Sequence, residues 1–390
     1  MRGWTIADLD GTFIAETGAN QPGAYCAEVD PSGDDNLTTT DVSHHAGPHP
    51  PVTPGTGRGA EPVFIVGMNG SGTTMLLESL GRHPGLYAFP RETRLIPHLY
   101  AHREGFGDLS DDRNFLRLWN KVRHLTVFQY VNGGAEVPLP ADWAAYPRDL
   151  SAVLDAVFRY FAAREGKSRW CEKTPQHAQH LHALSRMYPH ARFVHVIRDG
   201  RDCAASFHRR WSRTPELTMY RWKRLVRDAR RQGRQLGAER YLELWYEKIT
   251  SEPELWLRRV SDFVGLEFDP AVLQSRHLYL QTQATPAVAP AGTSLRPNSG
   301  KWRHYFTPGQ CTRLEEIGGA ALHEFGYETS IPAGDRDLSA LKQRTCAVKD
   351  ALIQYSREIA LKLGGRIERP WRIILTRPVV AWRHRRVNRY

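Results

Sequence analysis

A glycine-rich turn at residues 67–74 (GMNGSGTT) holds the first residues whose types and spacing suit chemistry. The β-branched run PVFIVG leads into it, and TTMLLESLGRH, which predicts a helix, follows it. Glycines let a backbone wrap closely around an anion, and the N–H groups at a helix N-terminus point at that anion. A turn of this kind can also be purely structural. The functional interpretation is a phosphate-binding turn made by Gly70, Ser71, Gly72, Thr73 and Thr74.

The turn nearly fits the pattern G-x-x-x-x-G-K-[ST] of nucleoside triphosphatases, but Thr73 stands at the lysine position. That lysine reaches the β- and γ-phosphates, so its replacement argues against hydrolysis of ATP or GTP. An ATP-dependent phosphotransferase of the nucleotide-kinase type stays open as an alternative function.

A second candidate anchor is the segment IRDGRDCAAS at residues 197–206, which ends a strand-like run and opens a helix. Arg198, at the carboxyl edge of that strand, can bind a phosphate with two parallel hydrogen bonds. Ser206, two turns into the helix, can add a hydroxyl. Ligands of open α/β sheets bind outside the carboxyl ends of the strands, so both motifs are expected at one edge. The alternative is an Arg–Asp pair that only caps a helix.

Together these two motifs resemble the 5′-phosphosulfate loop and the 3′-phosphate site of sulfotransferases that use 3′-phosphoadenosine 5′-phosphosulfate (PAPS). The resemblance runs in order over about residues 61–330 and is closest to the tyrosylprotein sulfotransferases. It implies an α/β three-layer sandwich with a central parallel sheet and a P-loop-like phosphosulfate-binding turn. It also implies an enzyme that moves a sulfuryl group from PAPS to an acceptor hydroxyl without a metal.

The same resemblance implies catalytic residues. Residues 83–97 (HPGLYAFPRETRLIP) are similar to the segment that holds the family's catalytic glutamate, which makes Glu92 the general base and places Arg94 on the acceptor side. The segment CEKTP resembles the one that supplies the active-site lysine, here Lys173. A base for the acceptor proton and a cation near the transferring group are what sulfuryl transfer requires.

Two further segments are assigned to the nucleotide on the same ground. Tyr246 belongs to a Tyr-Glu pair that the family places near the adenine. LRPNSGKW, at residues 295–302, resembles the late loop that closes over the nucleotide, with Arg296 and Lys301 as candidate phosphate ligands.

The chain departs from the family at Gly70, where an arginine or lysine usually precedes Ser-Gly-Thr and stabilises the leaving phosphate. Either Lys173 or another cation takes that task, or the chain is slow or catalytically inactive. The second alternative to an active sulfotransferase is therefore a nucleotide-binding protein on the same fold.

The elements that must position these residues alternate between strands and helices, which predicts a parallel α/β sheet. Strands are expected at 62–67 and 191–198 and within 241–249, and helices at 149–165, 176–188 and 216–236. We expect a sulfotransferase domain over residues 61–330. A disordered acidic tail of net charge −6 would precede it at 1–60, and a basic helical extension of net charge +9, with helices near 337–363 and 371–387, would follow it.

Composition narrows the partners. The chain has 390 residues, a net charge of +11 and five scattered cysteines without a C-x-x-C pair, which indicates neither a disulfide framework nor a zinc module. The spacing of His177, His180 and His182 fits a metal site poorly, and no metal is expected. Eight arginines mixed with apolar residues at 366–390 suit an anionic membrane surface or a helix packed on the domain. No recognised fold pattern supports nucleic acid.

Location and acceptor follow from weaker signals. The sequence contains no run of about 18 apolar residues and no basic-then-apolar leader at its start, so we expect a cytoplasmic protein, peripheral to a membrane at most. The Arg- and Ala-rich composition suggests a bacterial source. The acceptor hydroxyl can belong to a tyrosine, a carbohydrate, a lipid or a secondary metabolite. The oligomeric state stays open, with a homodimer among the options.

Overall fold

The computed structural model describes residues 5–7, 13–15, 61–274 and 299–362. The chain divides into a core unit, Pro51–Leu338, and a terminal unit formed by Met1–Pro50 and Ser339–Tyr390. The core unit thus runs eight residues past the domain end expected at residue 330. Arg296, the helix expected at 371–387 and most of the tail at 1–60 lie outside the described residues.

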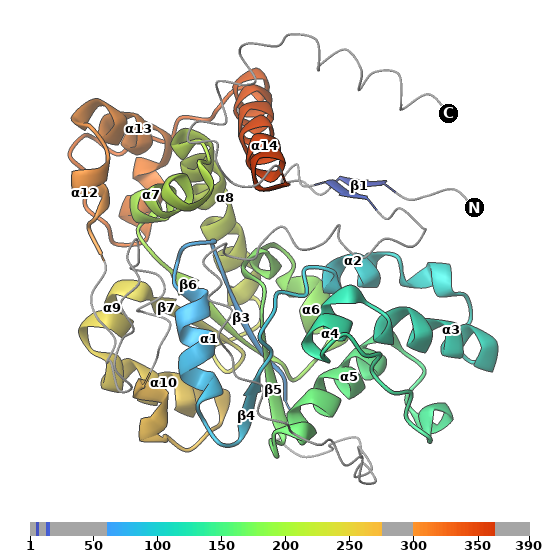
Figure 1. The fold of residues 1–390 in the computed structure, drawn as a ribbon. Coiled ribbons are helices and arrows are strands. Elements are labelled where there is room, and N and C mark those ends of the chain that lie inside the picture. Colours follow the sequence, from blue (N-terminus) through green and yellow to red (C-terminus); the bar gives the residue numbers. More distant parts are fainter. Residues whose placement is uncertain (1–4, 8–12, 16–60, 275–298, 363–390) are drawn as a thin grey trace, which may run out of the picture. The chain divides into compact units, whose positions relative to one another are not determined.

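A sheet of five parallel strands lies at the centre of the core unit, in the order β4-β5-β3-β6-β7 (Figure 1). Strand β3 is central, because it pairs with β5 on one side and with β6 on the other. Both neighbours come later in the chain, so the turn that follows β3 emerges at a topological switch point, where α/β proteins bind ligands. The strands span Val63–Gly67 (β3), Leu86–Ala88 (β4), Arg169–Lys173 (β5), Arg192–Ile197 (β6) and Tyr241–Trp245 (β7).

Helices cover both faces of this sheet, which gives the expected three layers. Alternate residues of β3 point to opposite faces. Val63 and Ile65 pack in one apolar cluster with residues of α1 (Thr73–Gly81) and α10 (Pro253–Val264). On the other face, Phe64 meets the rings of Trp170 and Tyr188 at 5.6 Å between centroids. The α/β sandwich predicted from the sequence is therefore confirmed.

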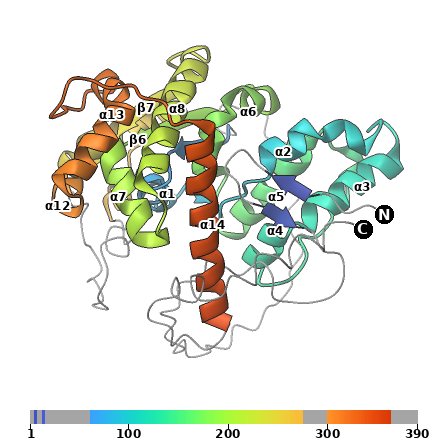
Figure 2. The same cartoon turned by 90° about the horizontal axis from the view of Figure 1, so that it is seen from above.

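Most of the other helices of the core unit fall into two groups beside the sheet (Figure 2). One group lies next to β4 and contains α5, which packs on β4 and β5. The other group is built on α8, which packs against α7 and α13. The first group comprises α2 (Ile96–Ala101), α3 (Asp112–Arg123), α4 (Thr126–Val131) and α5 (Leu150–Arg164); the second comprises α7 (Gly200–Trp211), α8 (Pro215–Arg234), α12 (Trp302–Tyr305) and α13 (Pro308–Glu324).

Several predicted elements differ from the observed ones. The helix expected at 176–188 is two pieces, a 3₁₀ helix η4 (Pro175–Gln179) and α6 (Leu181–Met187), and they meet at His180, whose backbone is not helical. The strand expected within 241–249 is confirmed as β7, and α9 (Tyr246–Ser251) begins directly after it. Strands β4 and β5 were not predicted, because β4 is only three residues long and β5 reads RWCEK, with charge at three of its five positions.

Among its described residues, the core unit also contains the 3₁₀ helices η2 (Arg103–Phe106), η3 (Trp143–Ala145) and η5 (Pro270–Leu273). In the terminal unit, β1 (Thr5–Ala7) and β2 (Phe13–Ala15) pair antiparallel, and α14 spans Ala340–Lys362. Within the described part of the chain, none of the helices has the length and apolarity needed to cross a membrane.

Candidate functional site

The turn after β3 is shaped by glycines with left-handed backbones. Gly70 has φ +87° and Gly72 has φ +99°, a region that residues with a Cβ rarely adopt. The N–H of Ser71 donates to the carbonyl of Met68 at 3.0 Å, which closes the turn. Gly72 is the N-cap of α1 and offers it no capping side chain, so the positive end of this helix faces whatever occupies the turn.

Two buried polar side chains of the turn lack hydrogen bonds to the described residues. These are the hydroxyl of Ser71, which is fully buried, and the amide oxygen of Asn69. Buried polar groups are nearly always paired in folded proteins, so unpaired ones at the end of a helix indicate room for a ligand. Together with the uncapped N-terminus of α1, they fit a phosphate or sulfate group.

Arg198 and Ser206 lie against this turn, as expected. Arg198 follows β6 and donates from Nη1 to the carbonyl of Gly70 at 2.9 Å. Its guanidinium also stacks on the ring of Tyr246, 4.4 Å from the centroid. A Cβ on Gly70 would come within 3.3 Å of the Ser206 hydroxyl, and one on Gly72 within 2.4 Å of the Tyr246 ring. The structure therefore brings the turn, Arg198, Ser206 and Tyr246 into one site at the carboxyl edge of the sheet.

The predicted base and lysine form a direct ion pair. Lys173 is the last residue of β5, and its Nζ lies 2.6 Å from Oε1 of Glu92. Arg94 holds the other carboxylate oxygen, with Nη2 at 2.8 Å and Nε at 3.0 Å. Glu92 lies in the loop between β4 and α2. Its side chain is 21% exposed, so part of it can be reached from solvent although it is paired with Lys173.

The charge state of Glu92 is set by these cations. Burial on its own would raise the pKa of Glu92, but Lys173 and then Arg94 outweigh it and hold the pKa below the ordinary value. The carboxylate is therefore ionised at neutral pH, as a general base must be.

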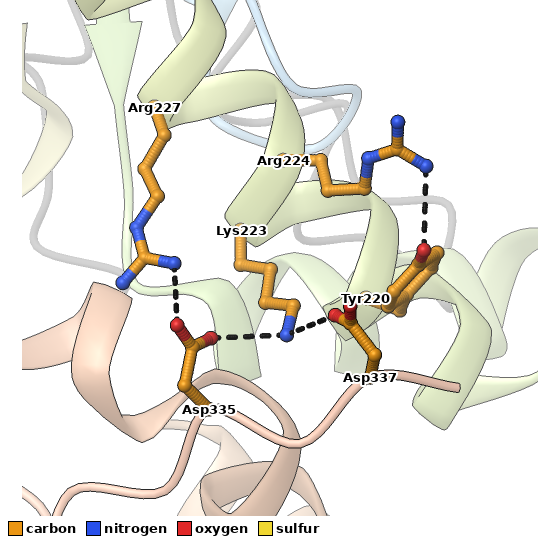
Figure 3. A pocket seen from close by; sticks show the side chains of 6 residues that line it. All are labelled: Tyr220, Lys223, Arg224, Arg227, Asp335 and Asp337. Carbon is orange, nitrogen blue, oxygen red and sulfur yellow. Dashed lines mark hydrogen bonds and ion pairs between the residues drawn. The ribbon is translucent and has the colours of Figure 1, made fainter. Parts of the chain in front are cut away.

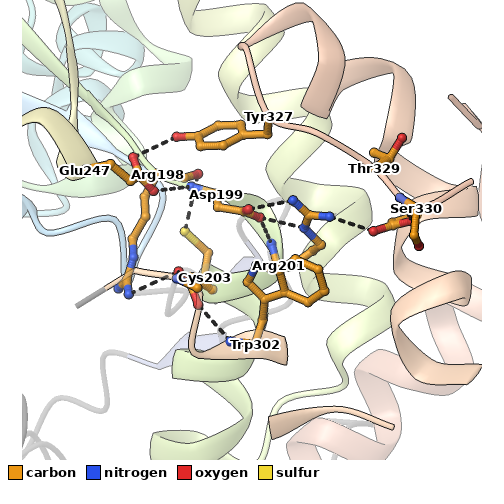
Figure 4. A network of polar contacts seen from close by, with 12 residues as sticks. Arg198, Asp199, Arg201, Cys203, Glu247, Trp302, Tyr327, Thr329 and Ser330 are labelled. Carbon is orange, nitrogen blue, oxygen red and sulfur yellow. Dashed lines mark hydrogen bonds and ion pairs between the residues drawn. The ribbon is translucent and has the colours of Figure 1, made fainter. Parts of the chain in front are cut away.

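The late segment, residues 300–302, is anchored by Asp202, which lies on α7, four residues after Arg198. Oδ2 of Asp202 accepts the N–H of Gly300 at 2.7 Å, and Oδ1 accepts that of Trp302 at 3.0 Å. The Trp302 ring lies over the guanidinium of Arg201 at 3.8 Å, and Figure 4 shows this stack within the polar network around Arg198. Lys301 lies between these two anchored residues. Burial and then the charges of Arg209 and Arg198 lower its pKa, which puts Lys301 in the field of the same site.

Sequence reasoning missed Arg210. Burial lowers its pKa, and the positive charges of Arg209 and then Arg198 lower it further, so Arg210 is close enough to Arg198 for the two charges to repel each other. It lies four residues after Ser206 on α7, and residues at that spacing share a helix face. This spacing is the signal that would have identified it.

A cavity of about 450 Å³ opens elsewhere, on α8 (Figure 3). Its cations are largely paired: Lys223 contacts Asp335 at 3.0 Å and Asp337 at 2.8 Å, and Arg227 contacts Asp335 at 2.8 Å. This cavity contains none of the predicted site residues, and we assign it no part in the chemistry.

The three histidines do not gather around a metal. His177 is buried against Glu172, whereas His180 and His182 are exposed. Over the described ranges, no group of three or more potential metal ligands occurs.

Comparisons with known proteins agree with the motifs. A model of the sulfotransferase family matches residues 62–270. Protein-tyrosine sulfotransferase 1 of Danio rerio is 26% identical over 228 residues, which are 55% of this chain and 56% of that protein. Protein-tyrosine sulfotransferase of Drosophila melanogaster is 25% identical over 235 residues, 57% of this chain and 42% of that protein. The chain thus spans about half the length of these relatives.

Among solved structures, the sulfotransferase domain of an olefin synthase from Synechococcus PCC 7002 aligns with 75% of this chain and 95% of its own. Its TM-score is 0.40 and its sequence identity is 22%.

Proposed function

The chain belongs to the sulfotransferase family, and on that premise we propose that it transfers the sulfuryl group of PAPS to a hydroxyl of an acceptor. One observation carries the proposal: the glycine turn with its uncapped helix end and the Glu92–Lys173 pair both lie at the carboxyl edge of the sheet. An anion site next to an ionised base is what this reaction needs.

The donor would be held by residues already in contact. The turn from Gly70 to Thr74 and the N-terminus of α1 would bind the 5′-phosphosulfate. Arg198 and Ser206 would bind the 3′-phosphate, with Arg210 and Lys301 adding positive charge. Tyr246 packs under the turn and beside Arg198, which fits a role in shaping the nucleotide site; its contact with adenine stays a prediction.

The transfer step uses Glu92 on the acceptor. Its carboxylate takes the proton of the acceptor hydroxyl while the hydroxyl oxygen forms a bond to sulfur. The bond between sulfur and the oxygen of the 5′-phosphate breaks, and the products are a sulfate ester and 3′-phosphoadenosine 5′-phosphate. Lys173, which pairs with Glu92 in the structure, is the cation that can steady the charge that develops during transfer.

Gly70 has a structural reason to differ from the usual basic residue. Its φ of +87° is strained for any residue with a side chain, and a Cβ there would press on Ser206. We therefore assign the neutralisation of the leaving phosphate to the N-terminus of α1 and to Lys173 rather than to position 70.

The identity of the acceptor is the finer part of the proposal. The relatives in Danio rerio and Drosophila are protein-tyrosine sulfotransferases, which favours a tyrosine phenol as the first acceptor to try. Carbohydrate, lipid and secondary-metabolite hydroxyls complete the set of candidates.

The test is transfer of sulfur-radiolabelled sulfate from PAPS to a panel of these acceptors, with release of 3′-phosphoadenosine 5′-phosphate measured in parallel. We expect stoichiometric sulfate ester and nucleotide product with at least one acceptor class. Transfer of a labelled phosphoryl group from ATP in place of sulfate would establish the phosphotransferase alternative. Tight binding of PAPS without turnover on the full panel would instead favour the inactive binding protein.

A further inference from the structure

A second carboxylate, Glu172, is buried beside the proposed base and has no part in the chemistry described so far. Its side chain is fully buried. Oε1 accepts hydrogen bonds from the N–H of Thr93 at 3.2 Å and from its hydroxyl at 2.9 Å. The hydroxyl of Thr174 donates to the same oxygen at 2.5 Å. On the other side, Oε2 lies 3.1 Å from Nδ1 of His177.

These contacts keep the buried carboxylate ionised. Burial on its own would raise the pKa of Glu172, but His177 and the hydrogen bonds from Thr174 and Thr93 more than compensate and lower it. A buried charge persists only where such partners surround it. Removal of one partner should therefore weaken the contacts that the carboxylate makes with the others.

The placement of Glu172 follows from strand geometry. Glu172 and Lys173 are consecutive residues of β5, so their side chains point to opposite faces of the sheet. Lys173 binds Glu92 and Glu172 binds Thr93, which are themselves consecutive. Two neighbouring residues of one strand thus hold two neighbouring residues of the loop, and this fixes the register in which base and lysine meet.

Further hydrogen bonds join the loop to β5 and to Thr174, which follows that strand. The backbone bond from the N–H of Phe89 to the carbonyl of Cys171 is the last one that joins it to β5 within the described residues. Further along, the N–H of Arg94 donates to the Thr174 hydroxyl at 3.3 Å, and Arg94 itself has a positive φ of 52°. Thr93 of the loop therefore bonds to Glu172 directly, and Arg94 of the loop is linked to Glu172 through the hydroxyl of Thr174.

We infer that Glu172 is a positioning residue for sulfuryl transfer: through Thr93 and Thr174 it holds Glu92 in contact with Lys173. The inference rests on the proposed function for its meaning in catalysis. Its geometric content can nevertheless be measured in the protein without nucleotide.

Two variants of Thr93 form a matched pair. Thr93→Val keeps the shape of the side chain and removes the hydroxyl that donates to Glu172, whereas Thr93→Ser keeps that hydroxyl. The contact between Glu92 and Lys173 should loosen only in the valine variant. Because Lys173 and Arg94 are the described cations in contact with Glu92, that loosening raises the pKa of Glu92 toward its ordinary value.

The first readout is an NMR titration of isotope-labelled glutamate carboxyl groups in the full chain without nucleotide, with the Glu92 signal assigned from Glu92→Gln. We expect the Glu92 pKa to rise in Thr93→Val and to match the wild type in Thr93→Ser. Equal pKa values in all three proteins would overturn the inference, whether or not the wild type transfers sulfate.

The second readout is turnover. In Thr93→Val, kcat should fall about tenfold or more with KM for PAPS unchanged, because small displacements of a catalytic group cost rate rather than donor binding. Thr93→Ser should restore kcat. Glu172→Gln should act on the same step, so the double variant Thr93→Val/Glu172→Gln should lose no more than the stronger single variant. Additive losses would show that Thr93 acts independently of Glu172. A wild type that binds no PAPS would refute the proposed function and leave the titration as the test of geometry.

Discussion

The glycine-rich turn at residues 67–74 and the Glu92–Lys173 pair lie at the same edge of the sheet, but different parts of the chain hold them in place. The turn is shaped by its own backbone, through Gly70 and Gly72 in left-handed conformations and the helix that begins at Thr73. The pair joins residues 81 positions apart, and side chains of the loop and of β5 hold it. A site held by backbone tolerates few substitutions in the turn itself, whereas one held by side chains depends on partners far along the chain.

The largest effect is expected at the side-chain site. Glu92→Gln keeps the shape of the residue but cannot take a proton, so kcat should fall about 10²- to 10⁴-fold. The affinity for 3′-phosphoadenosine 5′-phosphate should stay within about twofold, because the base does not hold the nucleotide. Glu104→Gln, at a side chain that is 91% exposed, is the control. Full activity of Glu92→Gln would remove Glu92 from its role.

The backbone site should fail through stability. In Gly72→Ala the alanine must adopt a φ of +99°, and its methyl group meets the Tyr246 ring. The free energy of unfolding should therefore drop by about 2 kcal/mol or more. Gly166→Ala has a positive φ without neighbouring atoms, and it should lose only about 1–2 kcal/mol. Urea denaturation of both variants measures the difference. Equal losses would mean that contact with Tyr246 does not restrict the turn.

The pH profile tests whether cations set the charge of the base. Transfer requires ionised Glu92, so the rate is constant above its pKa and falls as the pH drops through it. Since that pKa lies below 4.5, the acid limb of kcat/KM should also lie below about pH 4.5. Circular dichroism at each pH separates this limb from unfolding. An acid limb between about pH 6 and 7 would point to a histidine base instead.

The smallest effect is expected at Asp202, whose side chain holds the backbone of the late segment. Asp202→Asn weakens the anchoring of Gly300 and Trp302 and also removes the negative charge that lies 3.7 Å from Nη2 of Arg198. The affinity for 3′-phosphoadenosine 5′-phosphate should fall by about three- to tenfold. Asp262→Asn, on an exposed position of α10, should leave the affinity unchanged. Lys301→Ala, which leaves the Arg198–Asp202 pair in place, should lower the affinity as well, and an unchanged affinity in both variants would exclude the late segment from nucleotide binding.

The same contrast explains what could be predicted from the sequence. The turn and the start of α7 are contiguous motifs whose chemistry is local, and their meeting at one sheet edge follows from parallel α/β topology. Glu92 and Lys173 were assigned only through a family resemblance, because no local pattern pairs them. Glu172 was not predicted. It lies in β5, whose charged residues are not typical of a buried strand, and its partner Thr93 becomes its neighbour only in the folded chain.

The central claim is that this edge of the sheet binds a nucleotide with a 3′-phosphate, and calorimetry tests it most directly. We expect the wild type to bind 3′-phosphoadenosine 5′-phosphate more tightly than ATP. Arg198→Ala should lose about ten- to hundredfold of that affinity, because a charged hydrogen-bonding partner of the 3′-phosphate is gone. Arg186→Ala, at an exposed position of α6, is the control and should bind like the wild type. Preference for ATP, or full affinity in Arg198→Ala, would contradict the account.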